Sequence, residues 1–372
     1  MKNYLKKSLV YTLIRKYKSK ILDCEFKSLL NELFSAHNDI IINKVKLGSI
    51  PVKPVVLGVG HLDWEKYGFW KTFEEKFDFD FLELKSSTNN ISQDVQNTIA
   101  SDILKATQLL LEKHGNVDFV FFYCDASYLN KQVLLALKKQ GISTVMMGLD
   151  DKHRYKKHQV NNVFGGQELI IPYLSFYWTT WKSLALHLNK QGYKAIYLAE
   201  GANQNYHKRE HVSNKDIDVL FLGNAYGVRK ETVDFLIANG VNIQAYGSGW
   251  DNGFVTFEET IELYNRSKIV LGVGGVGHSS QFKHLKGRDF EATMCGCCYL
   301  TTYNPELADW FDIGKEILCY SSDLELLEQI KYYLKSEKER EKIAENAYLK
   351  SISEHTWNDR LDALLNKIYE TT

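Results

Sequence analysis

Basic residues gather around the predicted start of one helix in the second half of the chain. Lys283, Lys286 and Arg288 lie within six residues, where a helical stretch near Lys286–Cys295 begins. The N–H groups at a helix start are available to bind an anion, and the helix dipole favours negative charge there. Three cations at this place predict a diphosphate site, and a solvated basic loop is the alternative that their spacing leaves open.

Glu291 follows Arg288 by three residues on the same predicted helix. A carboxylate one turn inside a phosphate-binding helix accepts hydrogen bonds from a ribose diol. The same spacing also fits an i, i+3 ion pair between Glu291 and Arg288 on the protein surface. The sequence therefore leaves open whether Glu291 binds a ribose or pairs with Arg288.

Glycine-rich loops follow three predicted strands in this half. They are Gly223–Gly227, Gly247–Trp250 and Gly274–Gly277. Ligands of parallel sheets bind outside the carboxyl ends of the strands, which is where these loops lie. The third loop does not match the dinucleotide fingerprint G-x-G-x-x-G at a helix start, so a nicotinamide cofactor is not expected.

The elements that must position these loops alternate between short apolar strands and helical periods. In the first half the predicted strands are Val55–Gly60, Asp80–Leu84, Val117–Cys124 and Ser143–Leu149. In the second half they are Ile217–Leu222, Val241–Tyr246, Lys268–Val273, Cys298–Thr302 and Glu316–Tyr320. Near-continuous apolar strands separated by helices predict parallel sheets covered on both faces. The last helix, which starts after Thr356, has a strong apolar stripe and must pack on another element.

Length, charge and cysteine spacing limit the number of domains and the kinds of partner and metal site that are expected. A chain of 372 residues predicts two domains at about 150 residues each. The 46 Lys and Arg residues balance 46 Asp and Glu residues, so no overall basic field predicts a nucleic-acid partner. No apolar run approaches the roughly 18 residues that span a bilayer. The three cysteines Cys295, Cys297 and Cys298 lack the spaced pairs of a zinc site, so no metal is expected.

Residues 1–20 form a basic arm that holds seven Lys and Arg residues and no acid. Its apolar positions recur every three to four residues, which fits an amphipathic helix on an anionic membrane surface. A helix packed on the protein with a solvated basic rim is the alternative. No signal peptide is expected, because lysines and arginines interrupt the apolar positions. A cytoplasmic location is the expectation, and the basic arm adds contact with a membrane if the first interpretation of it holds.

Several segments of the second half resemble one protein family. These segments include Lys286–Gly296 (KGRDFEATMCG), Tyr246–Trp250 (YGSGW) and His355–Trp357 (HTW). They resemble CgeB-like glycosyltransferases, which belong to the GT-B glycosyltransferases of the group 1 type. The resemblance covers residues 217–368 well and the first half loosely.

The resemblance implies an α/β fold of two facing Rossmann-like domains, with a C-terminal helix that crosses back. By this likeness Glu291 binds the donor ribose, Arg288 and Lys283 fit the diphosphate, and Arg229 is a second cation. The expected donor-binding set is Gly223, Arg229, Gly247, Gly274, Lys283, Arg288 and Glu291. Many relatives carry a second glutamate at the position of Lys283, so the sugar contacts and the stereochemical outcome do not carry over.

The expected domains are a basic helical extension (1–50), an acceptor domain (51–205), a nucleotide-sugar domain (206–353) and a crossover helix (354–372). An inverting reaction requires a general base. Polar residues at strand ends of the first half supply candidates, and His61, Asp150 and Asp151 rank ahead of Asp63, Asp125 and His153.

The implied activity is transfer of a hexosyl group, without a metal or another cofactor, from a nucleotide-diphosphate sugar to a glycan, lipid-linked or protein acceptor in cell-surface glycan biosynthesis. A sugar-nucleotide epimerase of the same fold and a non-catalytic coat or scaffold protein are the alternatives.

Overall fold

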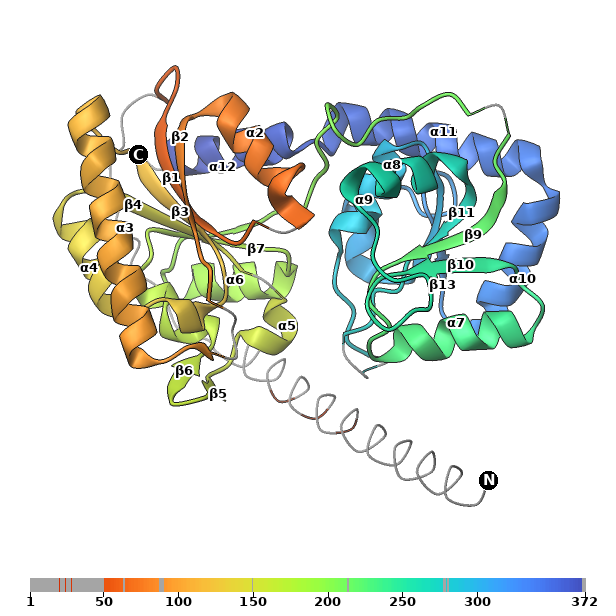
Figure 1. Ribbon diagram of the computed structural model, residues 1–372, viewed down its shortest axis with the longest axis horizontal. Helices are drawn as coiled ribbons and strands as arrows, with labels where there is room; N and C mark the ends of the chain where they lie inside the picture. Colours follow the sequence, from red (N-terminus) through yellow and green to blue (C-terminus); the bar gives the residue numbers. More distant parts are fainter. Residues whose placement is uncertain are drawn as a thin grey trace. The chain divides into compact units, whose positions relative to one another are not determined.

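A computed structural model describes Lys20, Cys24, Ser28 and residues 50–369, except for 63, 87–89, 149, 213, 277, 278 and 280 and the side chain of Trp64. The predicted basic helix over residues 1–20 lies outside these residues, apart from Lys20. The chain divides into two compact units (Figure 1). We call Glu200–Thr356 the C-terminal unit, and the described residues between 50 and 199 together with those from Trp357 onward the N-terminal unit.

The N-terminal unit is built on a six-stranded parallel sheet in the order β2-β1-β3-β4-β7-β8. Its strands are β1 (Val55–Gly60), β2 (Asp78–Glu83), β3 (Phe119–Tyr123), β4 (Ser143–Met147), β7 (Phe176–Thr179) and β8 (Ala195–Tyr197). All residues of β1 and β3 are buried, as expected for strands covered on both faces.

Helices and short turns connect these strands. The helices are α2 (Phe69–Lys76), α3 (Gln93–His114), α4 (Lys131–Lys139), α5 (Asp151–Arg154) and α6 (Lys182–Lys190). A small antiparallel hairpin is formed by β5 (His158–Val160) and β6 (Val163–Gly165), and the short 3-10 turns are η1 (Trp64–Lys66), η3 (Ala126–Tyr128), η4 (Gln167–Leu169) and η5 (Ile171–Tyr173). Local sequence fixes the ends of α3, because the Ser92 hydroxyl accepts from the Val95 N–H and Gly115 ends the helix with φ +82°.

The last helix, α12 (Trp357–Tyr369), belongs to the N-terminal unit. Its first residue, Trp357, enters the aromatic core of that unit, with its ring 4.7 Å from Phe69 and 6.2 Å from Trp178. An ion pair of 2.7 Å between Lys76 of α2 and Asp362 also joins the helix to this unit. The predicted crossing-back of the C-terminal helix is therefore confirmed.

The C-terminal unit is built on a five-stranded parallel sheet in the order β10-β9-β11-β12-β13. The strands are β9 (Ile217–Leu222), β10 (Ile243–Tyr246), β11 (Ser267–Leu271), β12 (Cys298–Thr302) and β13 (Leu318–Tyr320). The helices are α7 (Val228–Ala238), α8 (Phe257–Arg266), α9 (Gly287–Met294), α10 (Asp323–Lys335) and α11 (Glu337–Glu354), and η6 (Pro305–Asp309) is a 3-10 turn.

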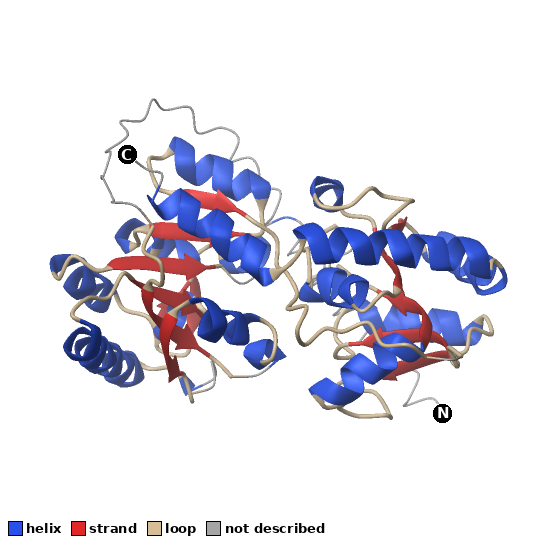
Figure 2. Ribbon diagram, turned by 90° about the horizontal axis from the view of Figure 1, so that it is seen from above, coloured by secondary structure: helices blue, strands red, loops and turns tan. Residues whose placement is uncertain are grey.

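Helices cover both faces of each sheet (Figure 2). In the C-terminal unit one buried cluster joins Val233 and Leu236 of α7 to Phe221 of β9 and Leu326 of α10. No helix in the described part of the chain is long and apolar enough to cross a membrane.

Candidate functional site

The chain reverses its direction of travel across the C-terminal sheet between β9 and β11. From β9 it continues to β10 at one edge, and from β11 it continues through β12 to β13 at the other edge. The loops that leave the carboxyl ends of β9 and β11 therefore diverge, and such a switch point is where open α/β sheets bind ligands. Gly223 begins the first of these loops and Gly272 the second.

Two guanidinium groups meet over Gly223. A Cβ on Gly223 would lie 2.6 Å from Nη2 of Arg288 and 3.4 Å from Nη1 of Arg229. Arg288 lies on the first turn of α9 and Arg229 on the first turn of α7. Arg288 also lies over the Phe221 ring, 5.3 Å from its centroid. The absence of a side chain at Gly223 is what lets both cations reach the end of β9.

Arg288 carries a buried nitrogen, Nη1, without a hydrogen-bond partner in the described part of the protein. Buried donors in native proteins are normally paired, and a guanidinium in a fixed position binds phosphate oxygens through two parallel N–H groups. The N–H groups at the start of α7, directly after Gly227, lie on the same loop as Gly223. This part of the unit suits a diphosphate.

Gly247 shapes the site by allowing two backbones to approach closely. A Cβ at this position, where φ is +125°, would lie 2.7 Å from the carbonyl carbon and oxygen of Gly223. The Gly223 N–H donates to the Tyr246 carbonyl at 2.9 Å, and Trp250 Nε1 donates to the Gly223 carbonyl at 2.7 Å. Gly247 thus holds the loop of Gly223 in place.

The start of α9 is fixed by Asp289, a residue that the sequence reasoning missed. Its Oδ2 accepts from the Lys286 N–H at 2.9 Å, and its Oδ1 accepts from the Tyr299 hydroxyl at 2.7 Å. Asp289 is buried, and burial raises the pKa of its carboxyl group. Its position three residues after Lys286 is the capping-box spacing, which is the signal that marks it in the sequence.

Glu291 lies one turn along α9, beside His207. The distance between Glu291 Oε1 and His207 Nε2 is 3.8 Å, and the side chains are 21% and 4% exposed. Burial raises the pKa of Glu291 to about 7, and burial lowers the pKa of His207 to about 4. At neutral pH the histidine is therefore uncharged, and Glu291 is close to the midpoint of its ionisation. No local pattern marks His207, because it lies 84 residues before Glu291.

Gly274 and Lys283 lie on the loop that connects β11 to α9. The Gly274 N–H donates to the Thr302 hydroxyl at 3.3 Å, and its carbonyl accepts from the His284 N–H at 3.0 Å. Lys283 pairs with Gly275 through a backbone bridge, and partial burial lowers the pKa of its ammonium group. Gly277 is outside the described residues.

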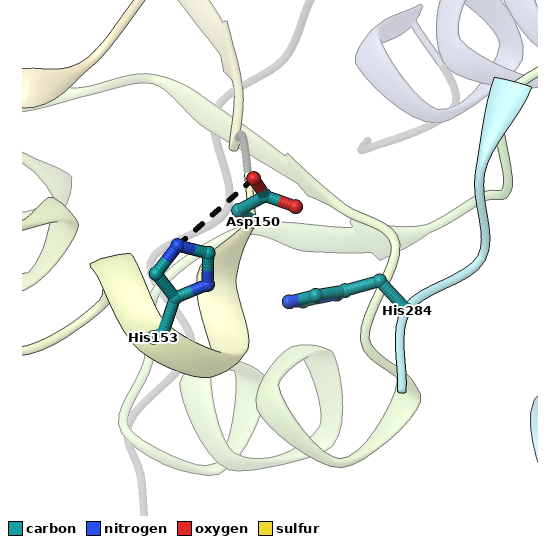
Figure 3. A group of neighbouring side chains, drawn as sticks. All are labelled: Asp150, His153 and His284. Atoms are coloured by element: carbon teal, nitrogen blue, oxygen red, sulfur yellow. Dashed lines mark ion pairs between the residues drawn. The ribbon is translucent and has the colours of Figure 1, made fainter. Parts of the chain in front are cut away.

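The three candidate bases belong to the N-terminal unit and differ in their surroundings. Asp150 has a left-handed backbone (φ +53°), its side chain is 46% exposed, and its Oδ2 lies 4.0 Å from Nε2 of His153 (Figure 3). His61 follows β1 and is half-buried, with its ring 5.1 Å from that of Tyr128. Asp63 lies outside the described residues.

Asp151, in contrast, is fully buried. One of its oxygens accepts from the Tyr177 hydroxyl at 2.6 Å, and the other accepts from the Thr179 hydroxyl. Burial raises the pKa of its carboxyl group to about 6. A side chain at Gly148 would overlap both the Asp151 carboxylate and the Tyr177 hydroxyl. These contacts give Asp151 a structural role at the end of β4.

The cysteine cluster between α9 and β12 is buried. The pKa of each thiol is raised by burial, to about 12 for Cys297 and Cys298 and well above the usual value for Cys295. The Cys297 thiol donates to the Tyr264 carbonyl at 3.2 Å. These residues act as small apolar side chains in the core.

Comparison with known proteins finds a family model that matches part of the chain. A family model described as "Glycosyl transferase-like" matches residues 229–366, a stretch that contains Arg229, Arg288 and Glu291. No curated protein sequence matches the chain.

Solved structures match almost the whole fold at low sequence identity. A glycosyltransferase from Rickettsia africae ESF-5 is 13% identical and has a TM-score of 0.56, with 86% of this chain and 98% of that chain covered. Anabaena Alr3699/HepE in complex with UDP and glucose is 11% identical, with a TM-score of 0.55 and coverage of 84% and 99%. The catalytic domain of starch synthase IV from Arabidopsis thaliana, bound to ADP and acarbose, is 10% identical, with a TM-score of 0.57 and coverage of 86% and 99%. The fold is that of the GT-B glycosyltransferases, as the family resemblance implies.

Proposed function

We propose that this protein is a glycosyltransferase that moves a hexosyl group from a nucleoside-diphosphate sugar to a glycan, lipid-linked or protein acceptor. The observation that carries the proposal is the meeting of Arg288 and Arg229 over Gly223, with Glu291 one turn along α9. The family match includes all three of these charged side chains. Alr3699/HepE with UDP and starch synthase IV with ADP show that relatives in fold accept nucleoside diphosphates.

In this proposal the C-terminal unit holds the donor. Arg288 and Arg229 bind the diphosphate, whose negative charge grows as the bond to the sugar breaks. Fixed cations and helix N–H groups stabilise that charge without having to reorganise, which lowers the barrier to transfer. Two guanidinium groups supply this stabilisation, so we propose a reaction that does not depend on a metal ion. Gly274 and Lys283 complete the proposed donor site on the neighbouring loop.

Glu291 is proposed to select the ribose. An ionised carboxylate offers two oxygen atoms, and these match the two hydroxyl donors of a ribose diol. Nε2 of His207 lies 3.8 Å from Oε1 of Glu291, and burial lowers the pKa of His207 to about 4, so at pH 7 the neutral histidine forms no ion pair that would hold the carboxylate away from a ribose.

The N-terminal unit is proposed to hold the acceptor. Asp150 and His61 remain the candidate bases, because both are at least partly accessible. The buried, doubly hydrogen-bonded Asp151 is better suited to fixing the end of β4. We place the enzyme with the CgeB-like subfamily, in the cytoplasm, where the basic segment 1–20 would hold it at an anionic membrane during cell-surface glycan synthesis.

A transfer assay with a panel of nucleotide sugars tests the proposal. UDP-, GDP-, ADP-, CDP- and dTDP-sugars are incubated with the protein, with and without a cell-envelope glycan fraction, and the released nucleoside diphosphate is measured. Release that rises with the glycan fraction and is lost in Arg288→Ala supports a transferase. Formation of an isomeric nucleotide sugar without acceptor indicates the epimerase instead. No turnover and no nucleotide binding indicate a scaffold.

A further inference from the structure

A cavity of about 420 Å³ lies in the C-terminal unit, outside the proposed donor site. Pockets that bind small molecules have volumes of roughly 300 to 1,000 Å³, so this cavity is large enough for a ligand. Four charged side chains line it, together with buried residues near the ends of two helices. The charged residues are Arg209, Glu210, Lys215 and Glu341, and the buried ones include Asn265 and Gly296. We call this space the rear cavity.

The rear cavity lies at the edge of the sheet opposite the donor site. Lys215 precedes β9 by two residues, Asn265 precedes β11 by two residues, and Gly296 precedes β12 by two residues. These three strands are parallel neighbours, so their amino ends meet at one edge. Gly223, in contrast, follows the carboxyl end of β9, at the other edge. A molecule in the rear cavity is therefore not a ligand of the donor site.

One wall of the rear cavity is the segment that leads into β9, and Asn265 holds this segment in place. The Asn265 amide donates to the Lys208 carbonyl at 2.9 Å, and its side-chain oxygen accepts from the Glu210 N–H at 2.7 Å. These two bonds fix the backbone on both sides of Arg209. A Cβ on Gly296, where φ is +72°, would lie 2.8 Å from Cδ of Arg209, so this glycine leaves the room that the arginine side chain occupies.

Arg209 and Lys215 bring positive charge that can still bind a ligand. Nη1 of Arg209 donates to the Glu345 carboxylate, and the guanidinium lies 4.9 Å from the centroid of the Tyr348 ring. Nε and Nη2 of Arg209 have no acceptor among the described residues. Nζ of Lys215 lies 3.6 Å from Oε2 of Glu341, which is beyond hydrogen-bond distance. Both cations can therefore donate to an anionic group.

Glu210 and two helix ends bring the opposite charge. The Glu210 side chain is exposed and forms no ion pair with the described residues. α8 ends at Arg266 and α9 ends at Met294, beside the lining residues Asn265 and Gly296. The carbonyl groups at the end of a helix carry partial negative charge and favour a cation. The rear cavity thus offers a place for a cationic group as well as an anionic one.

The presence of both signs of charge limits the class of ligand. A purely anionic ligand would lie against the carboxylates of Glu210 and Glu341. A purely cationic ligand would lie against Arg209 and Lys215. A ligand that carries one charge of each sign complements both sets. Because all four side chains line one small cavity, the two charges of such a ligand must be only a few bonds apart.

We infer that the rear cavity is a second ligand site, and that its ligand is a small zwitterion with an ammonium group and a carboxylate or phosphate group. Arg209 and Lys215 bind the acidic group, and Glu210 binds the ammonium group. A free amino acid and a phosphoethanolamine head group share this chemistry. The inference does not depend on the proposed transferase function, because the cavity is lined by other residues than the donor site.

Substitutions at the two signs of charge separate a zwitterion from a simple ion. Glu210→Gln should lower the affinity for the zwitterion about tenfold and raise the affinity for a simple phosphate, because it removes a charge that attracts ammonium and repels phosphate. Arg209→Gln should lower both affinities. Glu210 is exposed and the Arg209 side chain is 39% exposed, so both variants should fold. Lys208→Gln is the matched control, because Lys208 is the exposed neighbour of Arg209 and does not line the cavity.

Ligand-observed NMR titrations of the full-length protein at pH 7 supply the test. The probes are L-alanine, L-glutamine and O-phosphoethanolamine, with ethanolamine and methyl phosphate as comparisons that carry one sign of charge. We expect at least one zwitterion to bind wild type and Lys208→Gln equally, and to bind Glu210→Gln and Arg209→Gln about tenfold more weakly. Preference for O-phosphoethanolamine or for an amino acid supports the inference and identifies the source of the ligand. Binding of no zwitterion, equal binding by all four proteins, or equally tight binding of methyl phosphate by the wild type would overturn it.

The variant Arg288→Ala distinguishes the rear cavity from the donor site. Zwitterion binding that is unchanged in Arg288→Ala and weakened in Glu210→Gln supports the rear cavity. Zwitterion binding that is lost in Arg288→Ala and unchanged in Glu210→Gln places the ligand at the donor site and rejects the inference. A protein that binds a zwitterion through Glu210 and binds no nucleotide keeps the rear cavity and contradicts the proposed function alone.

Discussion

Nη2 of Arg288 lies 2.6 Å from the position that a Cβ on Gly223 would occupy. The two residues are 65 positions apart, and they meet because β9 and α9 belong to the same α/β unit. Any side chain at Gly223 must displace the guanidinium group of Arg288. The proposed binding of the diphosphate by Arg288 therefore requires a glycine at position 223.

Gly223→Ala should lower the affinity for a nucleoside diphosphate by about tenfold or more, because it removes charged hydrogen bonds that contribute about 1.5 to 3 kcal/mol each. Isothermal titration calorimetry measures this effect. Gly240→Ala is the matched control: Gly240 also has a positive φ (+79°), but a Cβ there meets no atom within 4 Å. It should lower stability by about 1 kcal/mol through backbone strain and leave affinity unchanged. Equal affinity in Gly223→Ala and wild type would contradict the coupling.

Arg288→Lys should also weaken nucleotide binding, by about tenfold, although it keeps the charge. Lysine lacks the planar fork that binds two phosphate oxygens at once. The comparison is Arg266→Lys, since Arg266 lies on α8 and pairs with Asp216 and Glu262 at the surface. That change should leave binding unaltered. If both variants bind like the wild type, Arg288 does not contact the diphosphate.

Nucleotide affinity should rise as the pH increases through about 7, because burial raises the pKa of Glu291 to about 7 and only the ionised carboxylate accepts both ribose hydroxyls. His207 does not titrate in this range, because burial lowers its pKa to about 4. Titrations with UDP and ADP between pH 6 and 8 in wild type and Glu291→Gln test this; the variant should bind weakly with a flatter profile. A wild-type profile that matches the variant would exclude Glu291 from the site.

The same carboxyl group links stability to pH. The ordinary pKa of a glutamate carboxyl group is 4.5, whereas the pKa of Glu291 in the folded protein is about 7. The folded state therefore binds this proton more tightly than the unfolded state does. The contribution of this group to stability is therefore full below pH 4.5 and is lost as pH rises through 7. We expect Glu291→Gln to raise the free energy of unfolding above pH 7 by about 2 kcal/mol relative to wild type. Denaturant unfolding at pH 5 and 8 measures the difference, and equal effects at both pH values would refute it.

Asp150 and Asp151 should respond differently to substitution. Asp151→Ala leaves the buried Tyr177 and Thr179 hydroxyls without their acceptor and should destabilise the protein by about 3 kcal/mol. Asp150→Asn suits the left-handed backbone and removes the charge of a side chain that is 46% exposed, so it should change stability by less than about 0.5 kcal/mol and lower transfer activity. Thermal unfolding and the transfer assay, run on both variants, show whether the roles divide in this way.

The strands were largely predictable, because their apolar runs are flanked by charged residues and glycines. β1, β9 and β12 have the predicted bounds, and β2 begins two residues earlier than the predicted Asp80. β7 was missed because a short apolar run such as FYWT fits a buried helix as well as a strand. α11 was missed as an element because its surface is mostly charged, so its few buried residues give little periodic signal.

The candidate donor site was predictable as a set of residue types and not as a geometry. Arg288 and Glu291 follow from cations and an acid near a helix start, and Arg229 follows from the family resemblance. The fold then shows that the two arginines meet over Gly223. The partners that fix the site were missed, because His207 and Tyr299 approach α9 only through tertiary packing.

The measurement that tests the central claim most directly is nucleotide binding by the purified full-length protein. Thermal unfolding is followed with UDP, GDP, ADP, CDP and dTDP, in wild type and in Glu291→Ala. A ligand at 100 times its dissociation constant adds about 2.7 kcal/mol to the folded state, which gives a clear shift of the midpoint. We predict that at least one nucleotide stabilises the wild type and has much less effect on the variant. Stabilisation by none of the five, or equal stabilisation of both proteins, would contradict the assignment of the donor site.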